Sequence, residues 1–217
     1  MAQDHFVACC LHHPISISMQ SIQFPNQGYV RSSVVDHQIT NLLEWINGIN
    51  EDTAKQDHSH VGNITREYVI NSAKVIDELR NILGPMVQQY CTDMHFSVDS
   101  RPLTLTTAWC NLQQSGEYFA AHTHVGVFSF ALWLTVPFTQ ADERAWREAR
   151  GKSGSETASF TFYYTDALGR ITNNTLEVDR EWENEIVVFP AEMMHSVTPY
   201  YSTDQLRIVV SGTVDYV

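Results

Sequence analysis

Three histidines have the type and spacing of a metal site. His122 and His124 lie two residues apart between two predicted strands, and His195 follows a short turn at the start of a later predicted strand. Residues i and i+2 of an extended segment point to the same side, so both imidazoles of the pair can reach one ion. A third histidine from a distant strand would complete a facial site with open positions for substrate and oxygen. The alternative is that all three are hydrogen-bonded core histidines.

An arginine and an asparagine could bind an anion beside such a site. Alternation along the last predicted strand places Arg207, Val209 and Ser211 on one face. If that face lines a barrel, a buried guanidinium requires an anion, and a carboxylate is its natural partner. Trp109 and Asn111 also share a face, from which the amide can hydrogen-bond a ligand carboxylate or carbonyl. The alternatives are an arginine that reaches solvent from a strand end, and a core tryptophan beside a turn asparagine.

Other polar residues are weaker candidates for a site. His58 and His60 have ligand spacing but lie in a polar stretch, residues 50–65, that is predicted to be a loop. Glu183, Glu185 and the acids of residues 139–157 are predicted to be solvated. No nucleophile elbow, phosphate-binding loop or dinucleotide-binding glycine pattern is present.

A change in hydrophobic period divides the chain. Residues 35–49 and 66–90 carry apolar residues at helical spacing, and Gly84-Pro85 is predicted to break or kink the second helix. Two short strands are predicted before them, at residues 5–11 and 15–24. From residue 103 the period is two, which is typical of strands. The strands predicted there are residues 103–109, 127–136, 159–165, 171–178, 185–189, 194–199 and 206–214.

This pattern predicts a single, mainly β (α+β) domain spanning residues 1–217. Several short strands with turns between them favour a sandwich or barrel. Residues 1–102 would supply N-terminal strands and supporting helices, and residues 103–217 would form the β core. The charged segment 139–157 lacks strand alternation and ends in a Gly/Ser-rich stretch, so it is predicted to be a mobile insertion or lid.

Composition excludes several classes of protein. The 217 residues are 43% hydrophobic and 18% charged, which indicates a globular chain. The formal net charge of −12 argues against general binding to nucleic acid or to an anionic membrane surface. No apolar stretch reaches the roughly 20 residues that a membrane span needs. The four cysteines show no CxxC spacing and are predicted to be reduced thiols of a cytoplasmic protein.

Several segments of the second half resemble a known family. They are Trp109-x-Asn111, His122-x-His124-x-Gly126-x-Phe128-Ser129-Phe130-x-x-Trp133-Leu134-x-x-Pro137, Phe160-x-Phe162, Val188-Phe189-Pro190-Ala191, Met194-His195-x-Val197-x-Pro199 and Arg207-Ile208-x-x-Ser211-Gly212. In this order they resemble the 2-oxoglutarate- and Fe(II)-dependent oxygenases found in marine cyanophages and bacteria. The resemblance covers roughly residues 103–214.

The resemblance implies a double-stranded β-helix, or jelly roll, with N-terminal helices packed on one side and iron at its open end. His122 and His195 would match the two histidine ligands, and His124 stands where the wider superfamily usually has Asp or Glu. Arg207 would pair with the distal carboxylate of 2-oxoglutarate. Its usual hydroxyl partner two residues on is here Val209, and Ser211 lies ~7 Å beyond by strand rise.

The three-histidine set has a physical consequence. Neutral imidazoles leave the full 2+ charge on the ion, and later divalent metals bind such a site more tightly than iron does. A dianionic 2-oxoglutarate can restore neutrality, so the change is compatible with oxygenase chemistry.

The sequence therefore predicts an Fe(II)/2-oxoglutarate-dependent dioxygenase, an oxidoreductase that hydroxylates a small-molecule or peptide substrate. The metal ligands would be His122, His124 and His195, and the cosubstrate contacts Arg207, Asn111 and Ser211. One alternative is a three-histidine, cupin-type metal enzyme that uses no 2-oxoglutarate. Another is a non-catalytic viral jelly-roll protein. A viral origin would place the protein in the cytoplasm of the host cell.

Overall fold

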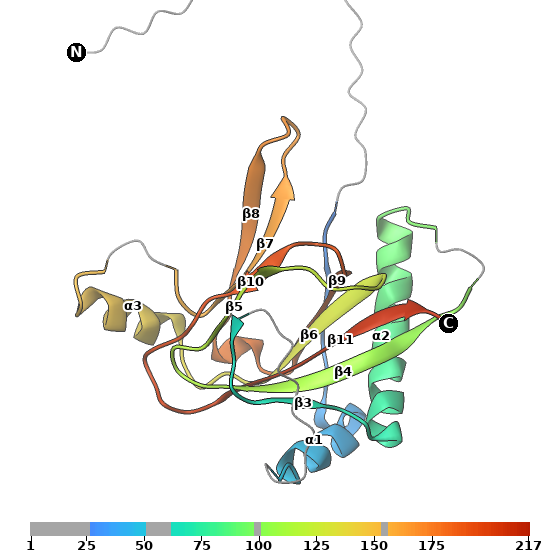
Figure 1. Ribbon diagram of the computed structural model, residues 1–217, viewed down its shortest axis with the longest axis horizontal. Coiled ribbons are helices and arrows are strands. Elements are labelled where there is room, and N and C mark those ends of the chain that lie inside the picture. The colour runs from blue at the N-terminus through green and yellow to red at the C-terminus, as the bar shows by residue number, and fades with distance from the viewer. Residues whose placement is uncertain (1–26, 51–61, 98–100, 153–155) are drawn as a thin grey trace, which may run out of the picture.

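Two antiparallel sheets form the body of the protein in the computed structural model, which describes residues 27–50, 62–97, 101–152 and 156–217 (Figure 1). One sheet has the order β1 (Val30–Ser33), β9 (Glu185–Pro190), β6 (Phe128–Thr135), β11 (Arg207–Tyr216), β4 (Leu103–Gln113) and β3 (Glu67–Val69). The other has the order β2 (Gly62–Asn63), β5 (Tyr118–His122), β10 (His195–Val197), β7 (Ser159–Thr165) and β8 (Ile171–Glu177). This arrangement confirms the predicted mainly β jelly roll. The strands expected at residues 5–11 and 15–24, together with His58 and His60, lie outside the described residues.

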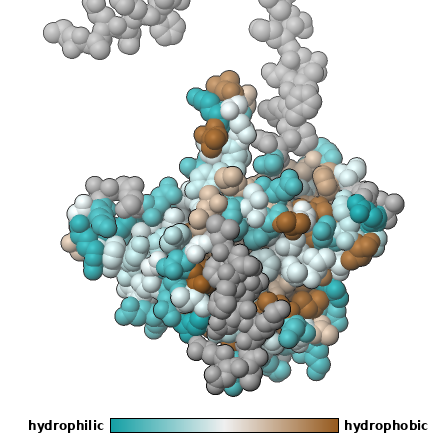
Figure 2. Space-filling model, in the orientation of Figure 1, coloured by the Kyte–Doolittle hydropathy of each residue, from teal (hydrophilic) through white to brown (hydrophobic). Residues whose placement is uncertain are grey.

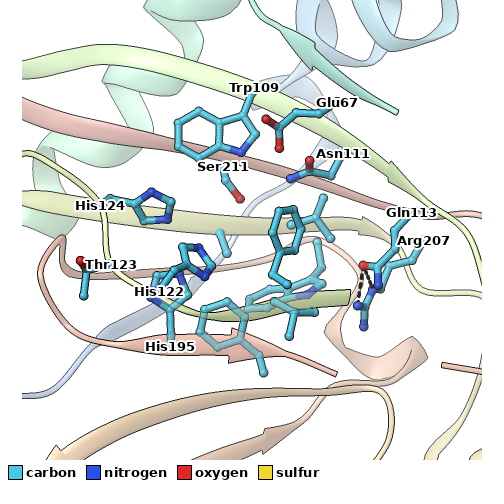
Figure 3. A pocket seen from close by; sticks show the side chains of 16 residues that line it. Glu67, Trp109, Asn111, Gln113, His122, Thr123, His124, His195, Arg207 and Ser211 are labelled. Atoms are coloured by element: carbon cyan, nitrogen blue, oxygen red, sulfur yellow. Dashed lines mark hydrogen bonds between the residues drawn. The ribbon is translucent and has the colours of Figure 1, made fainter. Parts of the chain in front are cut away.

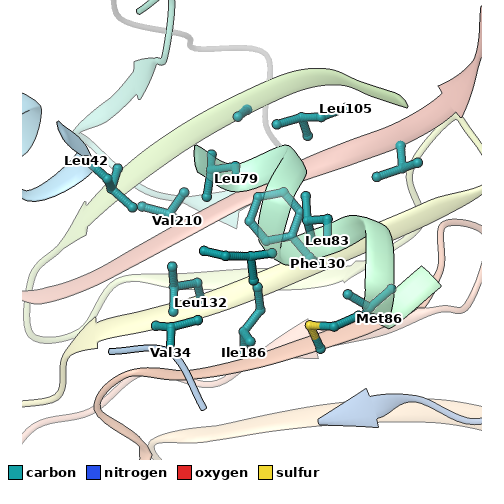
Figure 4. Packing of buried hydrophobic residues seen from close by; sticks show 14 of the residues in the cluster. Val34, Leu42, Leu79, Leu83, Met86, Leu105, Phe130, Leu132, Ile186 and Val210 are labelled. Atoms are coloured by element: carbon teal, nitrogen blue, oxygen red, sulfur yellow. The ribbon is translucent and has the colours of Figure 1, made fainter. Parts of the chain in front are cut away.

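The N-terminal helices cover the outer face of the six-stranded sheet, as predicted. Helix α1 (Thr40–Asn47) follows the short turn η1 (Asp36–Gln38) and packs against α2 (Ala73–Asp93), which contacts β1, β4 and β9. Figure 4 shows side chains of α2 interdigitating with those of the sheet. This cluster includes Leu79, Leu83 and Met86 from the helix, and Phe130, Leu132, Ile186 and Val210 from the strands. Burial of this face is the main stabilising contribution expected between the two layers.

A second cluster fills the space between the two sheets. Ala131 and Trp133 of β6 point into it, whereas Phe128 and Phe130 point to the helical layer. The alternation predicted for this strand is therefore confirmed. Phe160 and Phe162 of the opposite sheet complete the same inner cluster, together with Phe189 of β9 and Tyr200.

The second predicted helix differs from the structure in two ways. It begins at Ala73, after the N-cap residue Ser72, because residues 67–69 form β3 and pair with β4 instead. It also continues without a break through Gly84-Pro85 to Asp93, beyond the predicted end at residue 90. The buried stripe that includes Leu83, Met86 and Val87 spans the proline, and its packing offsets the loss of one backbone hydrogen bond.

The charged segment after β6, predicted to be a mobile insertion or lid, contains a helix. Thr139 caps α3 (Gln140–Glu148): its side chain accepts from the Asp142 amide, and Asp142 reciprocates at the Thr139 amide. This capping box satisfies backbone groups that the first helical turn would leave unpaired. Glu143 of this helix is fully buried, so the prediction that the acids of residues 139–157 are solvated is wrong for this residue.

Two further features complete the description. The β7–β8 hairpin projects from the body, and Figure 2 shows hydrophobic surface at its end, where Leu168 and Ile171 are exposed. The short turn η2 (Arg180–Trp182) then leads into β9.

Cys91 and Cys110 are both free thiols, whereas Cys9 and Cys10 lie outside the described residues. No helix in the described part of the chain is long and apolar enough to cross a membrane.

Two glycine substitutions should have opposite effects on stability. Gly212 lies in β11 between β4 and β6, where an added methyl group would overlap the Thr107 carbonyl oxygen and lie 2.6 Å from the Phe130 ring. We expect Gly212→Ala to lower the free energy of unfolding by about 1–3 kcal/mol. Gly84 is exposed inside α2, and apart from its chain neighbours no side-chain or neighbouring-strand atom lies near an added methyl group. Gly84→Ala should raise that free energy by less than about 1 kcal/mol, because Pro85 follows and reduces the gain from a better helix former. Urea denaturation measures both, and a shift of the same sign in the two variants would contradict this packing.

Candidate metal centre and pocket

A cavity of about 250 Å³ lies between the two sheets (Figure 3). Strands of both sheets contribute to its wall, and its labelled polar residues gather in three places in Figure 3. One group contains the three histidines, the second contains Arg207 and Gln113, and the third contains Glu67, Trp109 and Asn111. Apolar side chains, among them Ala131, Trp133, Phe160 and Val197, line the rest of the cavity.

The structure brings the three predicted histidines together. His122 ends β5 and His195 begins β10, and the two residues are directly paired between these strands. His124 follows the end of β5, where its amide donates to the Ala191 carbonyl at 2.8 Å. The ring centroids of the three are 4.4, 4.9 and 5.1 Å apart. One nitrogen from each ring lies within 4.8 Å of the others, which is the geometry of a site that can hold one metal ion.

Backbone carbonyls fix the orientation of two of these rings. Nδ1 of His122 lies 2.7 Å from the Ala120 carbonyl oxygen, and Nδ1 of His195 lies 2.9 Å from that of Met193. A carbonyl oxygen only accepts, so each Nδ1 carries the hydrogen and each Nε2 keeps its lone pair. Hydrogen bonds of this kind from the second ring nitrogen orient metal-binding histidines.

Burial keeps the three rings neutral. It lowers the pKa of His195 to about 3, and the neighbouring imidazole of His122 adds to the shift. It lowers the pKa of His124 to about 4 and also lowers that of His122. At neutral pH all three imidazoles therefore have the form that binds a cation.

A buried cation occupies a separate place in the cavity. Arg207 is 1% exposed, and its Nε and one terminal nitrogen lie 3.0 and 2.5 Å from Oε1 of Gln113. The guanidinium also donates to the backbone carbonyl of Thr198, at 3.5 Å. Both partners are neutral oxygens. Burial lowers the pKa of Arg207 only to about 10, so the pocket contains a protonated guanidinium at neutral pH. The alternative in which this arginine reaches solvent is excluded.

Strand pairing explains which residues share this wall. Arg207 is paired with Gln113, Val209 with Asn111, and Ser211 with Trp109, and all of them line the cavity. The two faces predicted from alternation are thus confirmed. Asn111 lies within β4, not in a turn, and its Oδ1 is buried without a hydrogen-bond partner in the described part of the chain. Ser211 lies nearer the histidines than Arg207 in Figure 3.

Sequence reasoning missed two polar residues of the pocket. Gln113 continues the alternation of Trp109 and Asn111, and this signal would have identified it had the predicted strand not ended at residue 109. Glu67 is 5% exposed and lines the cavity from β3, where it is paired with Asn111. The predicted helix 66–90 includes Glu67, so the sequence pattern did not indicate that this residue lies in a strand at the sheet edge.

Other buried polar groups hold the loop that leads to Arg207. Oε1 of Glu143 accepts hydrogen bonds from the amides of Tyr201 and Ser202, at 2.8 and 2.7 Å. The Tyr200 hydroxyl lies 2.8 Å from the Gln113 carbonyl and accepts from the Arg207 amide at 3.3 Å. This network connects α3 to the first residue of β11.

Glu183 and Glu185, which were also predicted to be solvated, have partners in the fold. Glu183 Oε1 accepts from the Val136 amide at 2.9 Å. Glu185 Oε2 lies 2.6 Å from Nε of Arg31 on β1, and its side chain is mostly buried. Both carboxylates are therefore part of the fold.

Comparison with known proteins gives a match to one family over just under half of the chain. Residues 107–212 match a family model described as "Putative 2OG-Fe(II) oxygenase". This segment contains the three histidines, Asn111, Gln113 and Arg207, whereas Glu67 precedes it. The resemblance predicted from the sequence is confirmed, and the family's description contains both predicted cofactors, Fe(II) and 2-oxoglutarate. No curated protein matches the chain by sequence. The origin in a marine cyanophage stays a prediction.

Solved structures share the fold at low sequence identity. A prolyl-4-hydroxylase from Pseudomonas putida has a TM-score of 0.52 at 11% identity, over 86% of this chain and 92% of that one. An oxidoreductase of the 2OG-Fe(II) oxygenase family from Burkholderia pseudomallei has a TM-score of 0.53 at 11% identity, over 87% and 84%. HygX from Streptomyces hygroscopicus, solved with nickel and 2-oxoglutarate bound, has a TM-score of 0.51 at 10% identity, over 87% and 83%. At these identities the likeness shows the fold.

The buried histidines should make the metal-free protein sensitive to acid. An unfolded histidine has a pKa near 6.5, whereas those of His195 and His124 in the fold are about 3 and 4. Between these values the unfolded chain binds more protons, so the free energy of unfolding falls as the pH falls from about 6.5 towards 4. The slope is roughly 1.4 kcal/mol per pH unit for each fully shifted histidine.

Urea denaturation across this pH range checks the effect. His195→Gln should unfold with a shallower pH dependence than the original chain, and His37→Gln, which alters an exposed histidine, serves as the control. Equal slopes in the original chain and in His195→Gln would show that His195 is not held neutral by the fold.

Proposed function

We infer that this chain, whose residues 107–212 match a 2OG-Fe(II) oxygenase family model, belongs to that family and hydroxylates a small-molecule or peptide substrate. The observation that carries this proposal is the content of one cavity. It holds three neutral imidazoles in one place and, in another, a protonated guanidinium that contacts no carboxylate of the described residues. A metal ion and a dicarboxylate are the pair of ligands that these two groups together would take.

The histidines fit Fe(II) as a donor set. His122 and His195 direct their Nε2 lone pairs away from the backbone that fixes Nδ1, and His124 adds a third nitrogen. Imidazole is a suitable ligand for iron, and a three-ligand site leaves positions for other molecules. Because none of the three carries charge, the full 2+ charge would remain to attract a dianion.

Arg207 fits the distal carboxylate of 2-oxoglutarate. Gln113 holds the guanidinium through a single oxygen and leaves its charge uncancelled. Gln113 itself is fixed because its Nε2 donates to the Glu117 carbonyl, so its Oε1 faces the arginine. We propose that Asn111 and Ser211, from the strand pair β4–β11, add hydrogen bonds along the cosubstrate between Arg207 and the histidines.

Each part of the pocket then has a role in turnover. When bound, Fe(II) supplies the centre at which 2-oxoglutarate is oxidatively decarboxylated to succinate while oxygen is inserted into a substrate C–H bond. The chain binds the metal, orients the cosubstrate through Arg207 and keeps water away with Trp133, Phe160 and Val197.

A three-histidine enzyme that uses no 2-oxoglutarate remains the second candidate. Two observations favour it: His124 replaces the usual carboxylate ligand, and Val209 replaces the usual hydroxyl beside the arginine. The buried charge of Arg207 favours the first candidate, because an anionic cosubstrate would supply the carboxylate contact that the guanidinium lacks among the described residues.

An anaerobic titration separates the candidates. Adding Fe(II) and then 2-oxoglutarate to the metal-free protein should produce a visible charge-transfer band that requires both additions. His195→Ala should abolish the band because it removes a metal ligand. Arg207→Met should raise the concentration of 2-oxoglutarate needed for it at least about tenfold, because a charge-assisted hydrogen-bonded contact is lost.

Arg31→Gln, which alters an exposed arginine, is the matched control and should titrate like the original chain. Iron binding without the band would favour the three-histidine enzyme. Absence of metal binding would leave a non-catalytic jelly roll as the remaining explanation.

Restoring a carboxylate at the third ligand should change metal preference. His124→Asp lowers the charge of the site and replaces a nitrogen donor with an oxygen donor, which reduces the advantage of nickel, copper and zinc over Fe(II). We expect the ratio of the Ni(II) and Fe(II) dissociation constants, measured by anaerobic competition, to move towards Fe(II). His37→Gln should leave the ratio unchanged, and an unchanged ratio in His124→Asp would show that His124 does not bind the metal.

A further inference from the structure

The third polar group of the cavity has a character opposite to that of Arg207. Glu67 and Asn111 face the cavity from the paired strands β3 and β4, and Trp109 lies beside them (Figure 3). Oδ1 of Asn111 is buried and accepts no hydrogen bond in the described part of the chain. This wall therefore presents a carboxylate, an amide oxygen and an aromatic ring, all of which attract a hydrogen-bond donor or a cation.

The wall also lies next to the histidines. The Trp109 ring centroid is 5.4 Å from that of His124, so a group held against the indole is close to the proposed metal centre. Arg207 and Gln113 lie apart from this wall in Figure 3, at the place proposed for the distal carboxylate. A ligand bound to Glu67 and one bound to Arg207 would therefore occupy different parts of the cavity.

The negative charge of Glu67 determines whether this part of the cavity can accept a cationic substrate. A divalent ion on neutral imidazoles, a dianionic cosubstrate and protonated Arg207 together leave one net positive charge. That charge would repel a cationic substrate, and the carboxylate of Glu67 cancels it within the same cavity. The formal charge of −12 on the whole chain also attracts cations towards the protein.

We propose that Glu67, Trp109 and the amide oxygen of Asn111 form a subsite for a primary ammonium group of the substrate, while the amide nitrogen of Asn111 donates to the cosubstrate. This inference rests on the proposed function, because the subsite would present the substrate to the metal centre. The cavity of about 250 Å³ must also hold the cosubstrate, so only the end of the substrate enters it. The substrate class is thus a small alkyl amine or the amine end of a lysine side chain.

Ligand binding to the protein loaded with Zn(II) and 2-oxoglutarate tests this subsite without turnover. NMR titrations compare n-butylammonium with its neutral isostere 1-butanol. The original chain should bind the cation more tightly than the alcohol. Glu67→Gln should raise the dissociation constant of the cation at least about tenfold, because a charge-assisted hydrogen bond is lost, and leave that of the alcohol unchanged. A titration with Nα-acetyl-lysine methylamide distinguishes the side-chain source from the free amine.

Glu192→Gln is the matched control, because it removes one exposed negative charge from the turn before His195 without altering the cavity wall. It should bind both ligands like the original chain. Calorimetric titration of 2-oxoglutarate should give the same or tighter binding in Glu67→Gln, since a negative charge is removed. If Glu67→Gln does not fold, Trp109→Leu should weaken binding of the cation more than that of the alcohol.

Equal affinity of the original chain for the two ligands would overturn the proposal, as would an equal loss of both in Glu67→Gln. Failure of the original chain to bind 2-oxoglutarate would instead refute the proposed function. The two failures are therefore distinguishable in one set of samples.

Discussion

The antiparallel register between β4 and β11 is the constraint on which the pocket depends. It places Arg207 opposite Gln113 and Ser211 opposite Trp109, with the intervening residues of both strands facing the helices. A slip of one residue would turn Arg207 into the helical layer and bring Val210 into the cavity. The apolar cluster around α2 opposes such a slip, because it buries the alternate residues of the same two strands. Hydrophobic packing on one face thus fixes the polar geometry of the other.

The second constraint is electrostatic. A buried guanidinium is costly unless its surroundings compensate for it. Here the compensation is spread over several groups: the Gln113 oxygen contacts Arg207 directly, while Glu143 acts from a distance and helps to keep its pKa high. The three histidines need no such compensation, because they remain uncharged in the same cavity. Positive and neutral groups can therefore coexist within a small volume.

Period-two alternation in the second half was sufficient to predict much of the fold and the composition of the pocket wall. His122, His124 and His195 were identified from spacing and from their places at strand ends, and the structure brings them together. Alternation also predicted the faces of Arg207 and Asn111. These features are local, since each depends on a few adjacent residues, and they survive in the folded protein because the sheets bury one face of each strand.

The features that sequence reasoning missed depend on contacts between distant segments. Glu67 lies in a stretch whose apolar residues also fit a helix, and only pairing with β4 makes it a strand. In the sequence, Glu143 resembles a solvated acid of a charged helix. In the fold it accepts hydrogen bonds from the amides of Tyr201 and Ser202. Gln113 acquires its importance from Arg207, which is remote in the chain. Local periodicity contains no information about such partners.

The link between α3 and the loop before β11 bears on how this architecture can change over evolution. A helix inserted between two strands is ordinarily free to vary in length or to disappear, because surface connections tolerate such changes. Here one carboxylate of that helix ties down the backbone just ahead of Arg207. The two segments must therefore be inherited together: a descendant that lost α3 would need another acceptor for the Tyr201 and Ser202 amides before it could keep its arginine in place.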